Sequence, residues 1–159
     1  MNPPLRSQAD VAAVVAALKE GIIDVIATDH APHTEADKLC EFDAAAFGIS
    51  GLETALAALL ALVHRGDISL NTLVSRLTCD PARILAGGRF ASELGSLKPG
   101  AIADIVIFDP NAQWMVDTSQ FASKGKNTPL AGSMLKGKVM ATIFGGKVAY
   151  KDEILNPKS

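Results

Sequence analysis

The spacing of apolar residues divides the start of the chain into a helix, a short strand and a loop. Four apolar residues recur at intervals of three and four, as on one face of a helix: Val11, Val14, Val15 and Leu18. We expect this helix to start after Ser7, a good N-cap, and to end at Gly21. The run Val25-Ile26-Ala27 is apolar and short, and it predicts a buried strand.

Three further helices are expected before residue 86. Ser50 to Glu53 has the spacing of a capping box. It opens a helix from Leu52 to about Arg65 that is apolar almost all round and therefore largely buried. Ser69 is expected to cap the next helix, and Asp80-Pro81 to start a short one with Asp80 at its N-cap.

Beyond Gly95 the pattern changes from helices to strands. We expect strands at 102–108 and 114–116, and a hairpin in which 138–144 and 147–150 flank the turn Gly145-Gly146. The polar stretch from Ser123 to Asn127 predicts a mobile loop. A helical α/β part up to residue 94 is thus followed by a β segment over 95–159.

Composition and charge narrow the class of protein. The 159 residues are 48% hydrophobic with a formal net charge of -2, and no basic patch suits a nucleic acid or a membrane surface. Cys40 and Cys79 have neither metal-type spacing nor a disulfide pattern, as in proteins of a reducing compartment. No apolar run is long enough to span a membrane. We expect a cytoplasmic, soluble protein.

Candidate chemistry is concentrated after the expected strand. Asp29, His30 and His33 follow it directly, and the ends of buried strands are where α/β enzymes present catalytic groups. An equally open interpretation is that Asp29 caps a turn and the histidines lie on a loop surface. Phe47-Gly48 lies near the end of a long loop. Either Gly48 lets the backbone come close to a ligand, or the pair packs and anchors the loop.

Several motifs together carry a resemblance to a known family. Thr28-Asp29-His30-Ala31-Pro32-His33 resembles the late motif of class I dihydroorotases, within the amidohydrolase superfamily. Further stretches agree, in order and with similar spacing: Asn2 to Arg6, Phe47 to Thr54, Asp80 to Ile84, Gly95 to Asp104 and Asn127 to Pro129. The combination of Asn2–Arg6 with Asp29–His33 is the most specific of these similarities.

The resemblance implies a fold and a reaction. Residues 1–94 would be the C-terminal part of a metal-dependent (β/α)8 barrel, its last helix-strand-helix units. Residues 95–159 would be the C-terminal part of a small β-sandwich domain. The implied reaction is the reversible, zinc-dependent cyclisation of N-carbamoyl-L-aspartate to L-dihydroorotate in pyrimidine synthesis.

The resemblance also implies roles for particular residues. Asp29 matches the family's catalytic aspartate, which binds the metal and acts as general base and then acid. His33 and Asn2 match positions that hold the substrate, and Phe47 and Gly48 match a pair whose backbone contacts the substrate ring. His30 matches no such role, and a supporting hydrogen bond is its expected function.

One departure from the family's pattern limits these expectations. A catalytic zinc site needs about three protein ligands, most of which the family supplies from a His-x-His pair and two later histidines. The sequence has three histidines and no His-x-His. We expect a C-terminal portion of a longer enzyme, inactive and poorly soluble alone, that associates with a missing N-terminal portion. The complete enzyme would be a homo-oligomer.

Two alternatives stay open. A related cyclic amidohydrolase, such as an allantoinase or a dihydropyrimidinase, would share the mechanism but should differ at His33 and in Asn2–Arg6. A non-catalytic dihydroorotase-like subunit that binds aspartate transcarbamoylase is the second alternative. The presence of Asp29, His33 and Asn2 disfavours it, because such relatives tend to have lost active-site residues.

Overall fold

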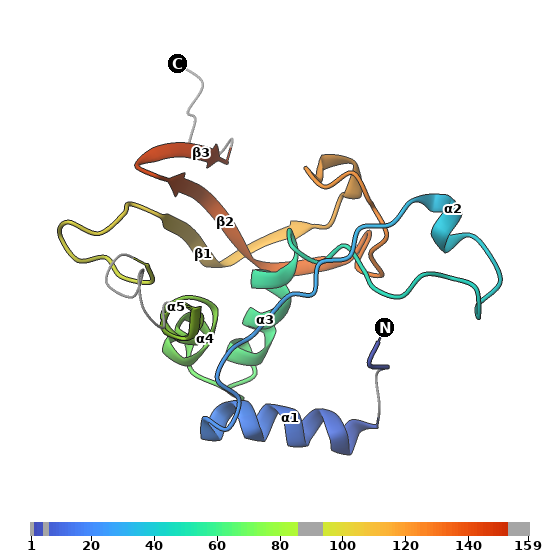
Figure 1. Cartoon of the computed structure of the whole chain (residues 1–159), viewed down its shortest axis with the longest axis horizontal. Coiled ribbons are helices and arrows are strands. Elements are labelled where there is room, and N and C mark those ends of the chain that lie inside the picture. Colours follow the sequence, from blue (N-terminus) through green and yellow to red (C-terminus); the bar gives the residue numbers. More distant parts are fainter. Residues whose placement is uncertain (1, 5–6, 86–93, 153–159) are drawn as a thin grey trace.

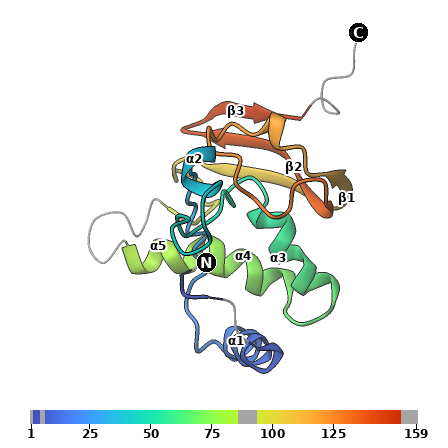
Figure 2. The same cartoon turned by 90° about the vertical axis from the view of Figure 1, so that its right-hand side faces the viewer.

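A computed structural model describes residues 2–4, 7–85 and 94–152. Its elements in chain order are α1 (Gln8–Glu20), α2 (Glu35–Lys38), α3 (Ala55–His64), α4 (Leu70–Leu77), α5 (Cys79–Leu85), β1 (Ile105–Met115), η1 (Thr118–Gln120), β2 (Met134–Phe144) and β3 (Lys147–Lys151). A small antiparallel sheet lies over α3, α4 and α5, and α1 lies on the far side of these helices (Figures 1 and 2). Leu5, Arg6 and the expected end of the β segment, 153–159, are outside the described residues.

Helix α1 has the ends that the sequence predicts. The Ser7 hydroxyl accepts from the Asp10 N–H at 3.3 Å, and the Asp10 carboxylate accepts from the Ser7 N–H at 2.9 Å. Gly21 ends the helix with φ +79°, a left-handed conformation that glycine adopts without strain. The apolar face of α1 is only partly covered, because Leu18 is buried whereas Val11 and Val14 are 47% and 58% exposed.

The predicted strand at Val25–Ala27 is wrong. The segment is not part of any β ladder, and the Ile26 N–H donates to the carbonyl oxygen of Arg76 at 3.1 Å instead. A strand needs a neighbouring strand for its hydrogen bonds, and the described part of the chain places none beside it. The prediction that this run is buried also fails at Ala27, which is exposed.

Helix α3 begins at Ala55, three residues later than predicted, and its capping box does not form. Thr54 is the N-cap, without a side-chain hydrogen bond to the helix. Ser50 and Glu53 bond to the distant loop 123–127 instead. Burial is also less complete than predicted, since Ala57 and Leu60 are buried and the remaining apolar side chains are half-buried or exposed. The main apolar core joins four buried residues of this layer: Leu18, Leu60, Ile68 and Leu73.

Helices α4 and α5 confirm one predicted cap and contradict another. Ser69 caps α4 by accepting from the Thr72 N–H at 3.0 Å. Asp80 is not the N-cap of α5, which starts at Cys79. Its buried carboxylate forms ion pairs with Arg76 at 2.9 Å and Arg83 at 3.0 Å.

The environment of Asp80 predicts a pH dependence of stability. The Ser75 hydroxyl, which donates to the carboxylate, and the guanidinium groups of Arg83 and Arg76 hold the pKa of Asp80 below its ordinary value of 3.8. Because the folded-state pKa is lowered, this stabilisation is complete above pH 3.8 and is lost as the pH falls through the lowered value. We therefore expect Asp80→Asn to be less stable than the unchanged chain at pH 6. This difference should be smaller at pH 3, below the ordinary pKa, where part of the stabilisation is lost.

Urea unfolding of both proteins at the two pH values checks this expectation. Comparing the two chains cancels the titration of the other carboxylates, which they share. A difference in urea midpoint that stays constant between pH 6 and pH 3 would contradict the assignment.

The sheet has the order β1-β2-β3 and is antiparallel throughout. The hairpin turn at Gly145-Gly146 is confirmed. The two strands predicted at 102–108 and 114–116 form the single strand β1, whose register shifts between Asp109 and Gln113. The sheet packs on α3 where Gly137 of β2 meets Leu60: a Cβ at Gly137 would lie 2.3 Å from Leu60 Cδ1, so only glycine fits there.

Two findings bear on the predicted compartment. Among the described residues, no helix is long and apolar enough to cross a bilayer. Cys40 and Cys79 both have free thiols.

Candidate functional site

Three loops meet beside α2, and together they contain most of the candidate residues. The first loop is 29–34, which follows the Val25–Ala27 segment. The second is 46–50, which leads toward α3, and the third is 123–127, between η1 and β2. His30 and Ile49 form an isolated parallel bridge, in which the Ala31 N–H donates to the carbonyl oxygen of Ile49 at 2.9 Å. The first two loops therefore lie side by side (Figure 1).

His33 contacts the Phe47-Gly48 pair directly. His33 Nε2 lies 2.7 Å from the carbonyl oxygen of Phe47. A carbonyl oxygen only accepts hydrogen bonds, so Nε2 carries the hydrogen and Nδ1 is the ring nitrogen left for another partner. The structure thus brings together three of the five predicted site residues, His33, Phe47 and Gly48.

Gly48 allows the two loops to pack closely. It is buried with φ +103°, and a Cβ at this position would lie 2.5 Å from the Ala31 Cβ. Both its backbone conformation and the contact with Ala31 require glycine. The space that Gly48 leaves is therefore filled by the neighbouring loop, which agrees with the packed-anchor interpretation for Gly48, whereas the Phe47 side chain is 65% exposed.

Asp29 precedes the bridge and has an unusual backbone. It is exposed, and its φ of +45° is uncommon for a residue with a side chain. Such conformations are often found at functional sites. Asn2 is also exposed, and the described residues give it no hydrogen bond to Asp29 or His33. The catalytic and substrate-binding roles of Asp29, Asn2, His33, Phe47 and Gly48 stay predictions.

His30 supports the site through hydrogen bonds, which agrees with its expected function. His30 Nδ1 accepts from the N–H groups of Gly51 and Leu52 at 3.2 and 3.1 Å. Its Nε2 lies 3.4 Å from Ser123 Oγ. Because Nδ1 is an acceptor, the hydrogen is on Nε2, and the ring links the first turn before α3 to the 123–127 loop.

Two residues that the sequence analysis did not identify join these loops. Asn127 Oδ1 accepts from the His33 N–H at 2.8 Å, and its Nδ2 donates to the carbonyl oxygens of Ala31 and Gly48. Lys38 Nζ donates to the carbonyl oxygens of Ala46 and Gly48. The only sequence signal was the placement of Asn127 in one of the similar motifs. Polar groups of the 123–127 loop bond to the other two loops, and its predicted mobility stays a prediction.

The site has positive charge on one side. A cavity of about 320 Å³ borders His33 and Asn127 and is lined in addition by Thr34, Glu35, Lys38, Leu39, Lys124 and Lys126. Thr34 is the N-cap of α2, a helix that the sequence analysis missed, and the Asp37 carboxylate completes the capping box by accepting from the Thr34 N–H. Hydrogen bonds from the Thr34 hydroxyl and N–H lower the pKa of Asp37, and the charge of His33 contributes in the same direction.

The described residues do not form a metal centre by themselves. Within the ranges that the structure describes, no group of three or more His, Cys, Asp or Glu side chains is placed to hold an ion. Asp29 could supply one carboxylate oxygen, whereas a catalytic zinc needs about three protein ligands. We therefore derive no catalytic step through a metal from this chain.

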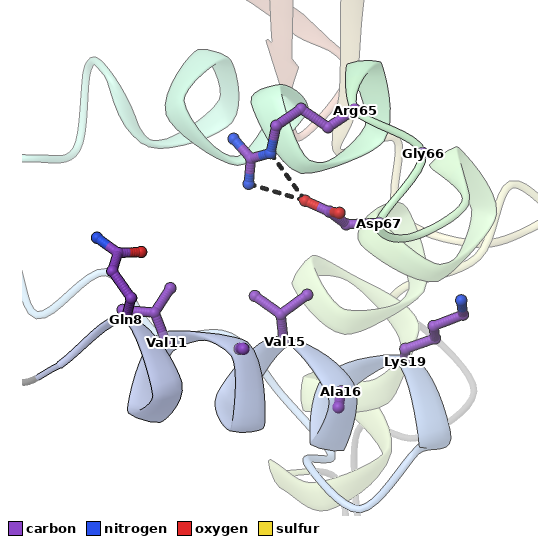
Figure 3. A pocket seen from close by; sticks show the side chains of 9 residues that line it. Gln8, Val11, Val15, Ala16, Lys19, Arg65, Gly66 and Asp67 are labelled. Carbon is purple, nitrogen blue, oxygen red and sulfur yellow. Dashed lines mark hydrogen bonds and ion pairs between the residues drawn. The ribbon is translucent and has the colours of Figure 1, made fainter.

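A second concavity lies elsewhere and shares no lining residue with the first. Its volume is about 410 Å³, and Figure 3 shows it between α1 and the turn after α3. Val11 and Val15 line one side, and the Arg65–Asp67 ion pair, at 2.8 Å, lies on the other. We do not assign it to the candidate site.

Comparison with known proteins gives the family. The model of the amidohydrolase family matches residues 2–149, and the chain belongs to that family. A dihydroorotase of Geobacter metallireducens is 52% identical over 151 residues, which cover 95% of this chain and 34% of the relative. A dihydroorotase of Pelotomaculum thermopropionicum is 50% identical, and this chain covers 35% of its length. The chain thus spans about a third of the relatives it matches.

Solved structures of hydantoinases have a similar fold. The L-hydantoinase (dihydropyrimidinase) from Arthrobacter aurescens superposes with a TM-score of 0.85 at 32% identity, over 94% of this chain and 33% of that one. The dihydropyrimidinase from Brevibacillus agri has a TM-score of 0.84 at 26% identity, over 95% of this chain and 33% of that one. The arrangement of helices and sheet described above is therefore an arrangement found in the amidohydrolase family.

Proposed function

We propose that this chain is the C-terminal third of a dihydroorotase, which interconverts N-carbamoyl-L-aspartate and L-dihydroorotate. The observation that carries the proposal is the 2.7 Å contact between His33 and the Phe47 carbonyl, which joins two of the motifs similar to dihydroorotases. Identities near 50% to dihydroorotases, against 32% or less to the hydantoinases, support the choice of substrate.

Asp29 would move the proton in this reaction. In the hydrolytic direction, water adds to the ring amide carbon, the C–N bond breaks, and the ring nitrogen must gain a proton. The Asp29 carboxylate would accept the proton of the attacking water and return it to the leaving nitrogen. A carboxylate at an exposed loop position suits this exchange, because it can lose and regain a proton without leaving a buried charge.

His33, Asn2 and the Phe47-Gly48 backbone would hold the substrate. With Nε2 bonded to the Phe47 carbonyl, His33 has Nδ1 available, which donates to a substrate carboxylate when the ring is doubly protonated. The side-chain amide of Asn2 would supply a second polar contact. The backbone of Phe47 and Gly48 would contact the ring amide.

The remaining parts of the enzyme would come from outside this chain. The complete enzyme would hold one or two zinc ions, with Asp29 as one ligand and the others on an N-terminal portion. In this proposal residues 1–94 complete a (β/α)8 barrel and 95–159 complete a small β domain. The assembled enzyme would be cytoplasmic and homo-oligomeric.

Exposed apolar side chains support an N-terminal partner. Val14 is 58% exposed on α1, and Ile22 just after that helix is 70% exposed. Apolar side chains left in water favour association when a partner can cover them. The missing barrel portion would cover them, and aspartate transcarbamoylase is the alternative partner.

A reconstitution assay tests the proposal. The chain would be co-expressed with the N-terminal two thirds of the Geobacter metallireducens relative, in a host without its own dihydroorotase. We expect the two parts to purify together and to hydrolyse L-dihydroorotate, and the chain alone to be inactive. The relative's own C-terminal third is the positive control. If that control restores activity and this chain does not, the proposal is wrong.

The second candidate is a dihydropyrimidinase, which the hydantoinase-like fold favours. The same assembly would be assayed with dihydrouracil and hydantoin. Turnover of these neutral rings in preference to L-dihydroorotate would replace the first proposal with the second. A dihydroorotase should instead reject them, because they lack the carboxylate that His33 would hold.

A further inference from the structure

Three successive carbonyl groups of the 46–50 loop are bonded to side chains rather than to backbone. Lys38 Nζ donates to the carbonyl oxygen of Ala46 at 2.6 Å and to that of Gly48 at 3.1 Å. His33 Nε2 donates to the intervening carbonyl oxygen of Phe47. Asn127 Nδ2 adds a longer bond, 3.3 Å, to the carbonyl oxygen of Gly48.

These bonds also determine where the neighbouring N–H groups point. A trans peptide unit is planar, with its carbonyl oxygen and its N–H on opposite sides. Fixing the Ala46 carbonyl on Lys38 therefore directs the Phe47 N–H away from the lysine. His33 orients the next unit, which carries the Gly48 N–H, in the same way. Within the described part of the chain, neither N–H has an acceptor at hydrogen-bonding distance.

We infer that Lys38 and Asn127 are positioning residues, which hold the Ala46–Gly48 loop so that the N–H groups of Phe47 and Gly48 are free for the substrate amide. This inference rests on the proposed function, in which that backbone contacts the ring. The ammonium of Lys38 bonds to the first and last carbonyls of the loop, and charge-assisted bonds of this kind are stronger than neutral ones.

The neighbouring lysine provides a matched control. Lys124 lines the same cavity as Lys38, but the described residues give its ammonium no hydrogen bond or ion pair. Lys38→Met and Lys124→Met each remove one positive charge beside His33. Only Lys38→Met removes the two bonds to the loop, so the comparison separates positioning from charge.

The test is NMR relaxation of the full 159-residue chain, together with titration of the reconstituted assembly with L-dihydroorotate. We expect the Phe47 and Gly48 amides to have order parameters of about 0.85 in the unchanged chain, and below about 0.6 in Lys38→Met. Lys124→Met should match the unchanged chain. Lys38→Arg, which keeps the charge and several donors, should restore most of the order. Affinity for L-dihydroorotate should fall about tenfold in Lys38→Met.

The outcomes separate this inference from the proposed function. Unchanged order parameters in Lys38→Met, or an equal change in Lys124→Met, would overturn the positioning role whether or not ligand binds. If the Ala46–Gly48 loop loses its order in Lys38→Met but the affinity for L-dihydroorotate is unchanged, the order of the loop does not affect substrate binding. If the assembly that contains the unchanged chain shows no ligand-induced shifts at Phe47 and Gly48, the substrate contact is wrong, while the relaxation data for the chain still decide the positioning. Asn127→Asp is the second variant for the same relaxation measurement. It keeps an acceptor for the His33 N–H but loses both amide donors.

Discussion

Asparagine in place of Asp29 is expected to lower the turnover of L-dihydroorotate by the reconstituted enzyme about 10²- to 10⁴-fold, the range typical for loss of a general acid–base group. Asparagine has nearly the same shape but cannot accept the proton of the attacking water or return it to the ring nitrogen. Because Asp29 is exposed, the change should have little effect on folding. The measurement is kcat of the assembly with the N-terminal portion of the relative.

Asp24→Asn is the control for this substitution. Asp24 is an exposed aspartate five residues earlier in the same segment, and the described residues bond only its backbone carbonyl, through Arg76. The control should keep the kcat of the unchanged chain. Gel filtration would verify that both variants still assemble. An Asp29→Asn assembly with normal turnover would show that this carboxylate does not move the proton.

Alanine in place of Leu60 is expected to destabilise the fold by about 2–5 kcal/mol. Leu60 is fully buried, packs with Leu18 and Leu73, and fills the space that Gly137 leaves under the sheet. Removing its side chain opens a cavity at the contact between α3 and β2. Because small domains have only about 5–15 kcal/mol of stability in total, we expect a large part of the population to unfold on mild heating.

Leu39→Ala is the matched control, since it removes the same atoms from a side chain that is 81% exposed. It should change the free energy of unfolding by no more than about 0.5 kcal/mol. Both values come from urea unfolding followed by circular dichroism. Equal effects of the two substitutions would contradict the core assigned to Leu60.

The features predicted correctly from the sequence depend on bonds within a few residues. Ser7 and Ser69 cap their helices through an N–H three residues later, and Gly21 ends α1 through its own backbone conformation. The Gly145-Gly146 hairpin is equally local, because two glycines adopt the positive φ values of the turn without strain. Such features form whenever the local chain folds, whatever lies around it.

The predictions that failed did so because other contacts replaced the expected ones. Ser50 and Glu53 have the spacing of a local cap, but they bond to residues 70 or more positions away. Asp80 has the sequence of an N-cap, yet the guanidinium of Arg76 on the preceding helix competes for its carboxylate. Val25–Ala27 has the composition of a strand, and no strand lies beside it in the described part of the chain. A long-range contact therefore replaces the local cap at Ser50 and Glu53, whereas a nearby ion pair replaces it at Asp80.

The sequence by itself determined the family, through the order and spacing of its motifs, and the family model matches residues 2–149. It also identified the loop after Asp24 as the centre of the candidate site. Only the tertiary structure decided how that loop is held: Asn127 reaches it across 94 residues, and Lys38 and His33 hold the carbonyl groups of the Ala46–Gly48 loop. The reason is physical, because no local pattern encodes a hydrogen bond whose two partners meet only when separate loops fold together.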